Sequence, residues 1–202
     1  MGLWDFVVGI LVGVLLACVS FVLQTSQISA IRGTLFGGVA NSTVRRHPIQ
    51  QRFLQDAGKQ IHVMKMAGYL FFGTIVGVEK KIRALLDEVF QIQPIRFLIL
   101  DLFNVDGVDF SAAEAFNRIN RILNAKDVQL VVCGLNMDGD LASSLRNVGL
   151  FDDSDSVQNF LSLNSALEYC ENELLKAFYH ERALAQSHQS SAGFLGKHVR
   201  SR

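Results

Sequence analysis

The 202-residue chain has no excess of charge of either sign, because 19 lysines and arginines balance 19 aspartates and glutamates. This balance gives no general support for nucleic-acid binding, which requires a basic surface. Cysteine is also scarce, and Cys18, Cys133 and Cys170 form no CxxC pair and have no histidine at ligand spacing. The sequence therefore predicts neither a disulfide framework nor a zinc site, and we expect no metal and no cofactor.

Apolar residues, in contrast, make up half of the chain and are concentrated at its start. The stretch from Phe6 to Leu23, FVVGILVGVLLACVSFVL, contains no charged residue. As a helix it would span about 27 Å, close to the ~30 Å hydrocarbon layer of a membrane. A signal peptide is the alternative, but the flank before the run carries Asp5 and no Lys or Arg, and the run is longer than the roughly 7 to 15 apolar residues of a signal peptide. The pattern favours a transmembrane helix over residues 1–24.

Basic residues dominate the segment after this helix, and its first acidic residue is Asp56. They are Arg32, Arg45, Arg46, Arg52 and Lys59. The positive-inside rule therefore predicts that the rest of the chain lies in the cytoplasm, beside the plasma membrane or a vacuolar or other internal membrane. We interpret residues 25–59 as a basic juxtamembrane linker, in which Arg32, Arg45 and Arg46 either contact anionic lipid or are simply solvated.

Small residues recur every fourth position in the apolar run, at Gly9, Gly13 and Ala17. This spacing places them on one helix face and would let a second helix approach closely. The candidate partners are other transmembrane helices of a transporter or a second copy of the chain. The alternative is that glycine is simply common in membrane helices.

From residue 60 to residue 178 the pattern is that of an α/β domain. IHVMKMAGYLFFG predicts two short strands and a turn, and near-continuous apolar runs predict buried strands at IRFLILDL and VQLVVCGL. Helical periodicity separates and follows these runs, and a Ser165 to Glu168 capping box is expected to open the last helix. The alternation predicts a mixed, mostly parallel sheet with packed helices. Residues 179–202 form a polar tail, expected to be disordered past about Gln186.

The stretch VDFSAAEAF lies where a strand gives way to a helix. Ser111 and Glu114 have the S-x-x-E spacing of a capping box, which favours Ser111 as the helix cap. The alternatives are a phosphorylated serine, or docking of an anion or phosphopeptide at the helix start, which the nearby carboxylate of Asp109 opposes. A nucleophilic serine would require G-x-S-x-G or a histidine partner, and this stretch has neither.

The ordered set GYLFFGTI, FLILDL, VDFSAAEAF and VQLVVCGL, preceded by an apolar span and a basic linker, resembles a known family. It is similar to the last membrane helix and STAS domain (sulfate transporter and anti-sigma factor antagonist) of SulP-type transporters, most of all fungal members, over residues 3–178. The resemblance implies a cytoplasmic STAS domain, and sulfate or another anion as the cargo of the transporter.

In the antagonist proteins of this family, the loop before the helix reads Asp-Ser-Ser-Gly or close to it, and its first serine is phosphorylated. Asp109 matches the aspartate, Phe110 stands in place of that serine, Ser111 matches the second serine, and Ala112 replaces the glycine. The resemblance therefore implies a docking loop, while Phe110 cannot accept a phosphate.

The function expected from the sequence is a regulatory or interaction domain on the last span of an anion transporter, and not an enzyme, since no paired titratable groups mark a catalytic site. A single span cannot enclose a transport pathway. The alternative is a single-span, membrane-tethered binding module. Expected partners are membrane lipid, other transmembrane helices and a cytoplasmic regulatory protein, without nucleic acid.

Overall fold

The computed structural model describes residues 2–26, 30–36, 41–88, 94–152 and 156–198. A five-stranded sheet forms its centre, in the order β1-β2-β3-β4-β5. The strands are β1 (Ile31–Phe36), β2 (Ile61–Leu70), β3 (Phe97–Val108), β4 (Gln129–Cys133) and β5 (Val157–Phe160). Only the pair β1 and β2 is antiparallel, and the other three neighbouring pairs are parallel. The predicted mixed, mostly parallel sheet is confirmed.

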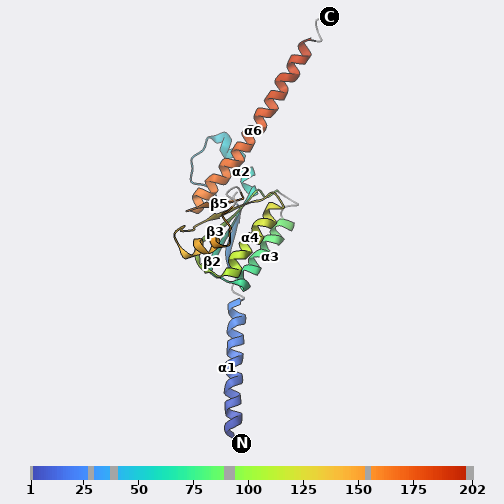
Figure 1. The fold of residues 1–202 in the computed structure, drawn as a ribbon. Coiled ribbons are helices and arrows are strands. Elements are labelled where there is room, and N and C mark those ends of the chain that lie inside the picture. Colours follow the sequence, from blue (N-terminus) through green and yellow to red (C-terminus); the bar gives the residue numbers. More distant parts are fainter. Residues whose placement is uncertain (1, 27–29, 37–40, 89–93, 153–155, 199–202) are drawn as a thin grey trace.

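Six α-helices are present among the described residues (Figure 1). They are α1 (Gly2–Ser26), α2 (Pro48–Ala57), α3 (Phe72–Glu88), α4 (Phe110–Asn124), α5 (Asp140–Asn147) and α6 (Leu163–His198), with a short 3-10 turn, η1 (Gly58–Gln60), before β2. Pro48 occupies the first turn of α2, where its missing N–H has no helical partner to lose.

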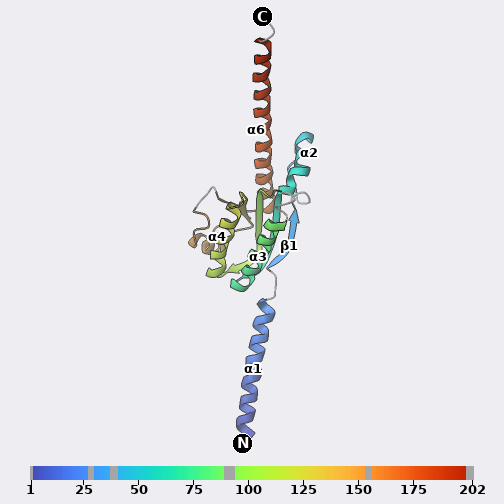
Figure 2. The same ribbon diagram turned by 90° about the vertical axis from the view of Figure 1, so that its right-hand side faces the viewer.

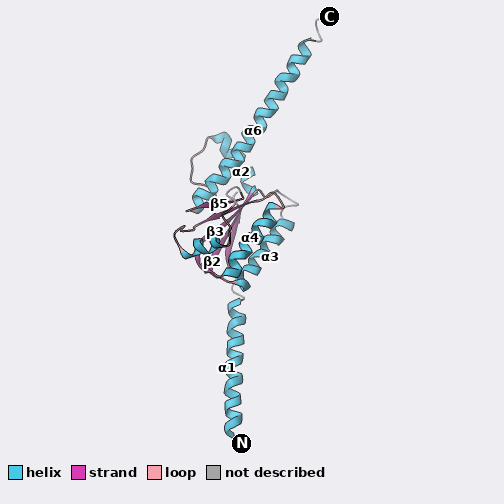
Figure 3. Cartoon of the chain, viewed as in Figure 1, coloured by secondary structure: helices cyan, strands magenta, loops and turns pink. Residues whose placement is uncertain are grey.

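The sheet is covered on both faces, which explains why its central strands are continuously apolar (Figure 3). Because successive side chains of a strand point to opposite faces, Leu98 and Leu100 of β3 join the core that includes α3, α4 and α5, whereas Ile99 joins the core that includes α2 and α6. The first six residues of β3, FLILDL, are all buried.

Three expectations about the strands need correction. Residues 61–70 form one strand rather than two strands and a turn, because Gly68, at a φ of 80°, absorbs a register shift against β3 without reversing the chain. β1 lies within the segment 25–59 interpreted as a linker, and β5 lies in what was expected to be a plain connection. Both are short strands at the two edges of the sheet, so their apolar patterns are weak.

Helix α1 is long and apolar enough over Phe6–Leu23 to cross a membrane, and none of that run is buried against the other described residues. It extends from one end of the domain, and α6 extends from the opposite end (Figures 1 and 2). The sequence predicted disorder past about Gln186, but α6 continues to His198. No proline interrupts residues 163–198, and alanine, leucine, glutamate and glutamine are good helix formers.

The orientation of the sheet relative to α1 determines which loops lie near the span. Ala67 N in β2 donates to Ala30 O at 2.9 Å, and Ile31 pairs with Met66, so β1 begins beside the carboxyl end of β2. Phe36 pairs with His62, so β1 ends beside the amino end of β2. The carboxyl ends of β2 and β3 therefore lie on the α1 side of the domain (Figure 2).

Candidate regulatory site at the start of α4

Asp109 is the residue that organises the junction between β3 and α4. Its Oδ1 accepts a hydrogen bond from Ala112 N at 2.6 Å, which makes it the N-cap of α4. Its Oδ2 accepts from Phe72 N at 3.2 Å, at the start of α3. Its own backbone N–H donates to Leu70 O at 3.0 Å. One carboxylate thus satisfies amides at the starts of two helices and ties the β2–α3 turn to the β3–α4 turn.

The predicted capping box at Ser111 and Glu114 is wrong, because α4 begins at Phe110 and the cap is Asp109. Ser111 lies inside the first turn, where its side chain cannot reach back to the amides that need a cap. Both Ser111 and Glu114 are exposed. Neither side chain forms a hydrogen bond or ion pair with another described residue, so each is available to a partner.

The box expected at the start of the last helix is also displaced. Ser162 directly precedes α6, and its Oγ accepts a hydrogen bond from Ser165 N at 3.2 Å. Ser162 therefore occupies the capping position that the sequence assigned to Ser165.

Aromatic side chains surround Asp109 on the protein surface. Phe110 is 67% exposed, Phe72 is 61% exposed and Tyr69 is 56% exposed. Tyr69 lies opposite Gly107 in the register of β2 and β3, and its ring passes so close that a Cβ at Gly107 would lie 2.7 Å from the ring. Glycine at this position thus allows the tyrosine ring to lie across β3.

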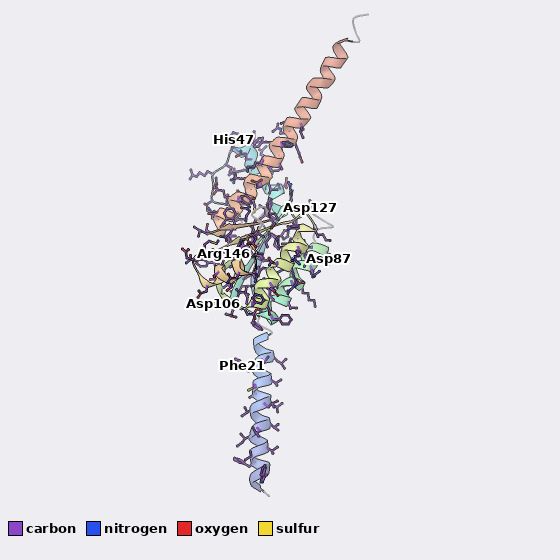
Figure 4. The ribbon with its side chains drawn as sticks, viewed as in Figure 1. Phe21, His47, Asp87, Asp106, Asp127 and Arg146 are labelled. Atoms are coloured by element: carbon purple, nitrogen blue, oxygen red, sulfur yellow. The ribbon has the colours of Figure 1, made fainter. Side chains whose placement is uncertain are left out.

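Figure 4 marks Asp106, just before Asp109, at the end of the domain next to α1, and His47 at the far end. The β3–α4 junction consequently belongs to the surface closest to the candidate membrane span.

Arg46 does not occupy the juxtamembrane position that the sequence suggested. Its Nε donates to Glu171 Oε2 at 2.9 Å, its Nη1 donates to Asn172 Oδ1 at 2.8 Å, and its side chain is only 10% exposed. Ser42 contributes two more hydrogen bonds to the Glu171 carboxylate, from N at 2.7 Å and from Oγ at 2.6 Å. This ion pair fastens the segment before α2 to α6.

Sequence reasoning missed Glu171, because 125 residues separate it from Arg46 and no local pattern links the two. Arg45 is exposed beside Arg46, and it precedes α2 beyond the end of β1 that lies away from α1. Arg32 is exposed in β1, near α1. Of the three arginines, Arg32 alone has the position required for contact with the membrane next to α1.

Gly9, Gly13 and Ala17 lie in the exposed helix α1, and among the residues that the structure describes nothing lies within 4 Å of the positions where a Cβ would be at the two glycines. Their role in helix packing remains a prediction.

Three buried titratable side chains, Cys133, Cys170 and His62, have pKa values shifted mainly by burial. Burial raises the pKa of the Cys133 thiol to about 12, with a further contribution from the nearby Asp101 carboxylate. Burial also raises the pKa of Cys170 and lowers that of His62. All three cysteines are free, and the described residues contain no cluster of three or more His, Cys, Asp or Glu that could hold a metal ion.

The sequence of this chain matches a protein family and a characterised relative. Residues 56–166 match the STAS domain family. The vacuolar basic amino acid transporter VSB1 of Saccharomyces cerevisiae is 44% identical over 180 residues, which cover 87% of this chain and 17% of that protein. The chain therefore spans about a sixth of the length of the curated relative that it matches, and the predicted likeness to fungal proteins is confirmed.

Solved structures give weaker likenesses. The STAS domain of a SulP transporter from Vibrio cholerae is 14% identical with a TM-score of 0.46, and covers 63% of this chain and 98% of that one. RsbS of Moorella thermoacetica is 17% identical with a TM-score of 0.47, and covers 56% of this chain and 89% of that one.

Proposed function

The chain belongs to the STAS domain family, and from this membership we propose that it forms the last membrane helix and the cytoplasmic regulatory domain of a SulP-like transporter. The observation that carries the proposal is the direct connection of an exposed helix, uncharged over Phe6–Leu23, to the edge strand of the STAS sheet. Only residues 27–30 separate α1 from β1, and β1 is hydrogen-bonded to β2 along the sheet edge. A displacement of the span would therefore be transmitted to the sheet.

The transport pathway would lie in other membrane helices, because one span cannot enclose a pathway. The family resemblance implied sulfate or another anion as cargo, but the relative of 44% identity is named for basic amino acids. We therefore propose basic amino acids as the cargo of the associated membrane part and a vacuolar membrane as its place. This domain would regulate that transport by binding and would catalyse no reaction.

The junction of β3 and α4 is the part of the domain best suited to regulation. It lies on the α1 side, and it presents Ser111 and Glu114 to solvent. A free helix start attracts anions, but here Asp109 already supplies a carboxylate to both α3 and α4. This arrangement supports docking of a protein partner, such as a cytoplasmic regulatory protein, over capture of a free anion.

A chimera tests the proposal directly. The matching segment of VSB1 is replaced by this chain in a yeast strain lacking VSB1, and uptake of arginine and of sulfate is measured in isolated vacuolar vesicles. We expect uptake of arginine and none of sulfate, compared with VSB1 truncated before the segment. If the chimera reaches the membrane at normal abundance and transports no more arginine than the truncated protein, the proposal is wrong.

Orientation has its own test, which uses the positive flank after α1. In sealed vesicles with the cytoplasmic side outward, added protease should digest the chain from about Arg32 onward, while α1 stays protected. Protection of the domain from protease would place it on the opposite side of the membrane.

A further inference from the structure

Three aromatic side chains on the α1 side of the domain are largely exposed to solvent, although the ring of Tyr69 also lies across β3 at Gly107. Tyr69 comes from β2, Phe72 from the first turn of α3 and Phe110 from the first turn of α4, and each is more than half exposed. They belong to the two turns that Asp109 ties together. We call this surface, defined by Tyr69, Phe72 and Phe110, the aromatic tip.

The covalent chain keeps the aromatic tip close to the end of the span. Helix α1 ends at Ser26 and β1 begins at Ile31, so at most about 17 Å of extended chain separates them. At the start of β1, Ala30 O accepts a hydrogen bond from Ala67 N, only two residues before Tyr69. If α1 crosses a bilayer, the tip must lie within reach of its surface.

Tyrosine is enriched in the interfacial layer of membranes, at the level of the lipid headgroups, because its ring is apolar and its hydroxyl is polar. Phenylalanine is among the apolar residues that interfacial helices bury at the boundary between headgroups and acyl chains. Val76, 45% exposed one helical turn after Phe72, extends the apolar surface along α3. We propose that the aromatic tip inserts into the headgroup layer of the membrane that α1 spans, and so holds the STAS domain against the bilayer. The inference rests on the proposed membrane anchoring by α1.

The charges of the tip distinguish this docking from the usual attraction of a basic patch to anionic lipid. Residues 66–73 and 104–112, which form the two turns, contain no lysine or arginine. Asp106 is exposed there, and both oxygens of Asp109 are engaged by backbone amides. Insertion should therefore depend on the rings and proceed on zwitterionic lipid, and any gain from anionic lipid should come from Arg32, which lies near α1 outside the tip.

Depth-dependent fluorescence quenching tests the proposal on the full chain in phosphatidylcholine nanodiscs. An NBD label is attached to a single exposed cysteine, Phe110→Cys, with Cys18→Ser removing the exposed native thiol; Cys133 and Cys170 are buried and do not react. The matched control is Ala84→Cys, an exposed position near the other end of α3. Quenching is measured with lipids labelled with doxyl near the headgroup, and with aqueous iodide.

We expect the label at residue 110 to be quenched by the doxyl lipid and to be several-fold less accessible to iodide than the label at residue 84. Replacing Tyr69 and Phe72 by serine should restore access to iodide at residue 110. Equal iodide access at the two positions overturns the proposal. So does protection from iodide without lipid quenching, because a protein face, such as a second copy, would then cover the tip.

Two further measurements distinguish insertion of the aromatic tip from anchoring by α1 and from attraction by charge. An NBD label on native Cys18 reports whether α1 is in the bilayer. If lipid quenches the Cys18 label but not the label at residue 110, the aromatic tip does not insert and the anchoring by α1 stands; if lipid quenches neither, both proposals fall. Quenching at residue 110 that appears only when phosphatidylserine is added would show attraction by charge and would overturn insertion driven by the rings.

Discussion

Replacement of Asp109 should destabilise the domain far more than replacement of Ser111, although the sequence pattern assigned the cap to the serine. Asp109→Ala removes the N-cap of α4, which is worth about 0.5 to 2 kcal/mol. It also removes the hydrogen bond to Phe72 N, which adds only about 0.5 kcal/mol because water can reach that amide. The expected loss is about 1 to 2.5 kcal/mol, whereas Ser111→Ala should change stability by less than about 0.5 kcal/mol.

Asp109→Ser separates the two contributions of the carboxylate. Serine is a good N-cap, so the bond to Ala112 N should be retained, but its shorter side chain cannot also reach Phe72 N. We expect a loss of about 0.5 kcal/mol for this variant, the part due to the amide of α3.

The buried thiols provide the assay. In the full chain carrying Cys18→Ser, in detergent, Cys133 and Cys170 become available to a maleimide pulse only when the domain unfolds. Urea titration of this labelling gives the midpoint of unfolding. With a slope of about 2 kcal/mol per molar urea, Asp109→Ala should lower the midpoint by about 0.5 to 1.2 M. A midpoint for Asp109→Ala equal to that of Ser111→Ala would refute the assignment of the cap, as would a large shift for Ser111→Ala alone.

Three further predictions concern other parts of the chain. Glu171→Ala leaves the Arg46 guanidinium buried without its carboxylate and should lower the free energy of unfolding by about 3 to 5 kcal/mol in the same assay. Glu171→Gln keeps an acceptor oxygen and should cost less. Equal losses for the two variants would contradict a buried ion pair. The pKa of Cys133 is about 12 in the folded chain against 9.0 without burial, so the free energy of unfolding should fall as pH rises from about 9 toward 12. Cys133→Ala should make that fall less steep. An unchanged pH profile in this variant would exclude Cys133 as a source of the pH dependence. In a membrane association assay, Gly13→Ile should weaken helix pairing by ~1 kcal/mol or more while Leu15→Ile should not, and identical behaviour would leave the glycine without a packing role.

The amino-acid sequence alone was enough to predict the central strands, most helices and the span. The runs FLILDL and QLVVC are apolar because both faces of the sheet are covered, and α3 and α4 show the periodicity of helices with one buried side. The uncharged run Phe6–Leu23 predicted α1 in the same way. The strands, α3 and α4 are determined by burial over many consecutive residues, and α1 by an apolar run long enough to cross a membrane, so the sequence signal of each element is local.

Tertiary structure alone decided the elements and contacts that depend on distant partners. β1 and β5 are short and exist because an edge of the sheet is available to pair with them, which no pattern within IRGTLF or VQNF reveals. Asp109 and Ser111 are both acceptable caps by residue type. The choice followed from the bond between Asp109 N and Leu70 O, which keeps Asp109 in the strand conformation and lets the helix start only at Phe110.

The same holds for charge. Arg46 looked like an exposed linker arginine, in contact with lipid or simply solvated, because its neighbours in the sequence are polar and basic, yet it is buried against Glu171 of α6. A sequence records which groups carry charge, but the partner that makes burial of a charge tolerable is chosen only when the chain folds and water is excluded from between the two. The candidate span, the central strands and most helices could therefore be predicted from local pattern. The cap of α4, the ion pair that joins the segment before α2 to α6, and the position of the aromatic rings near α1 required the fold.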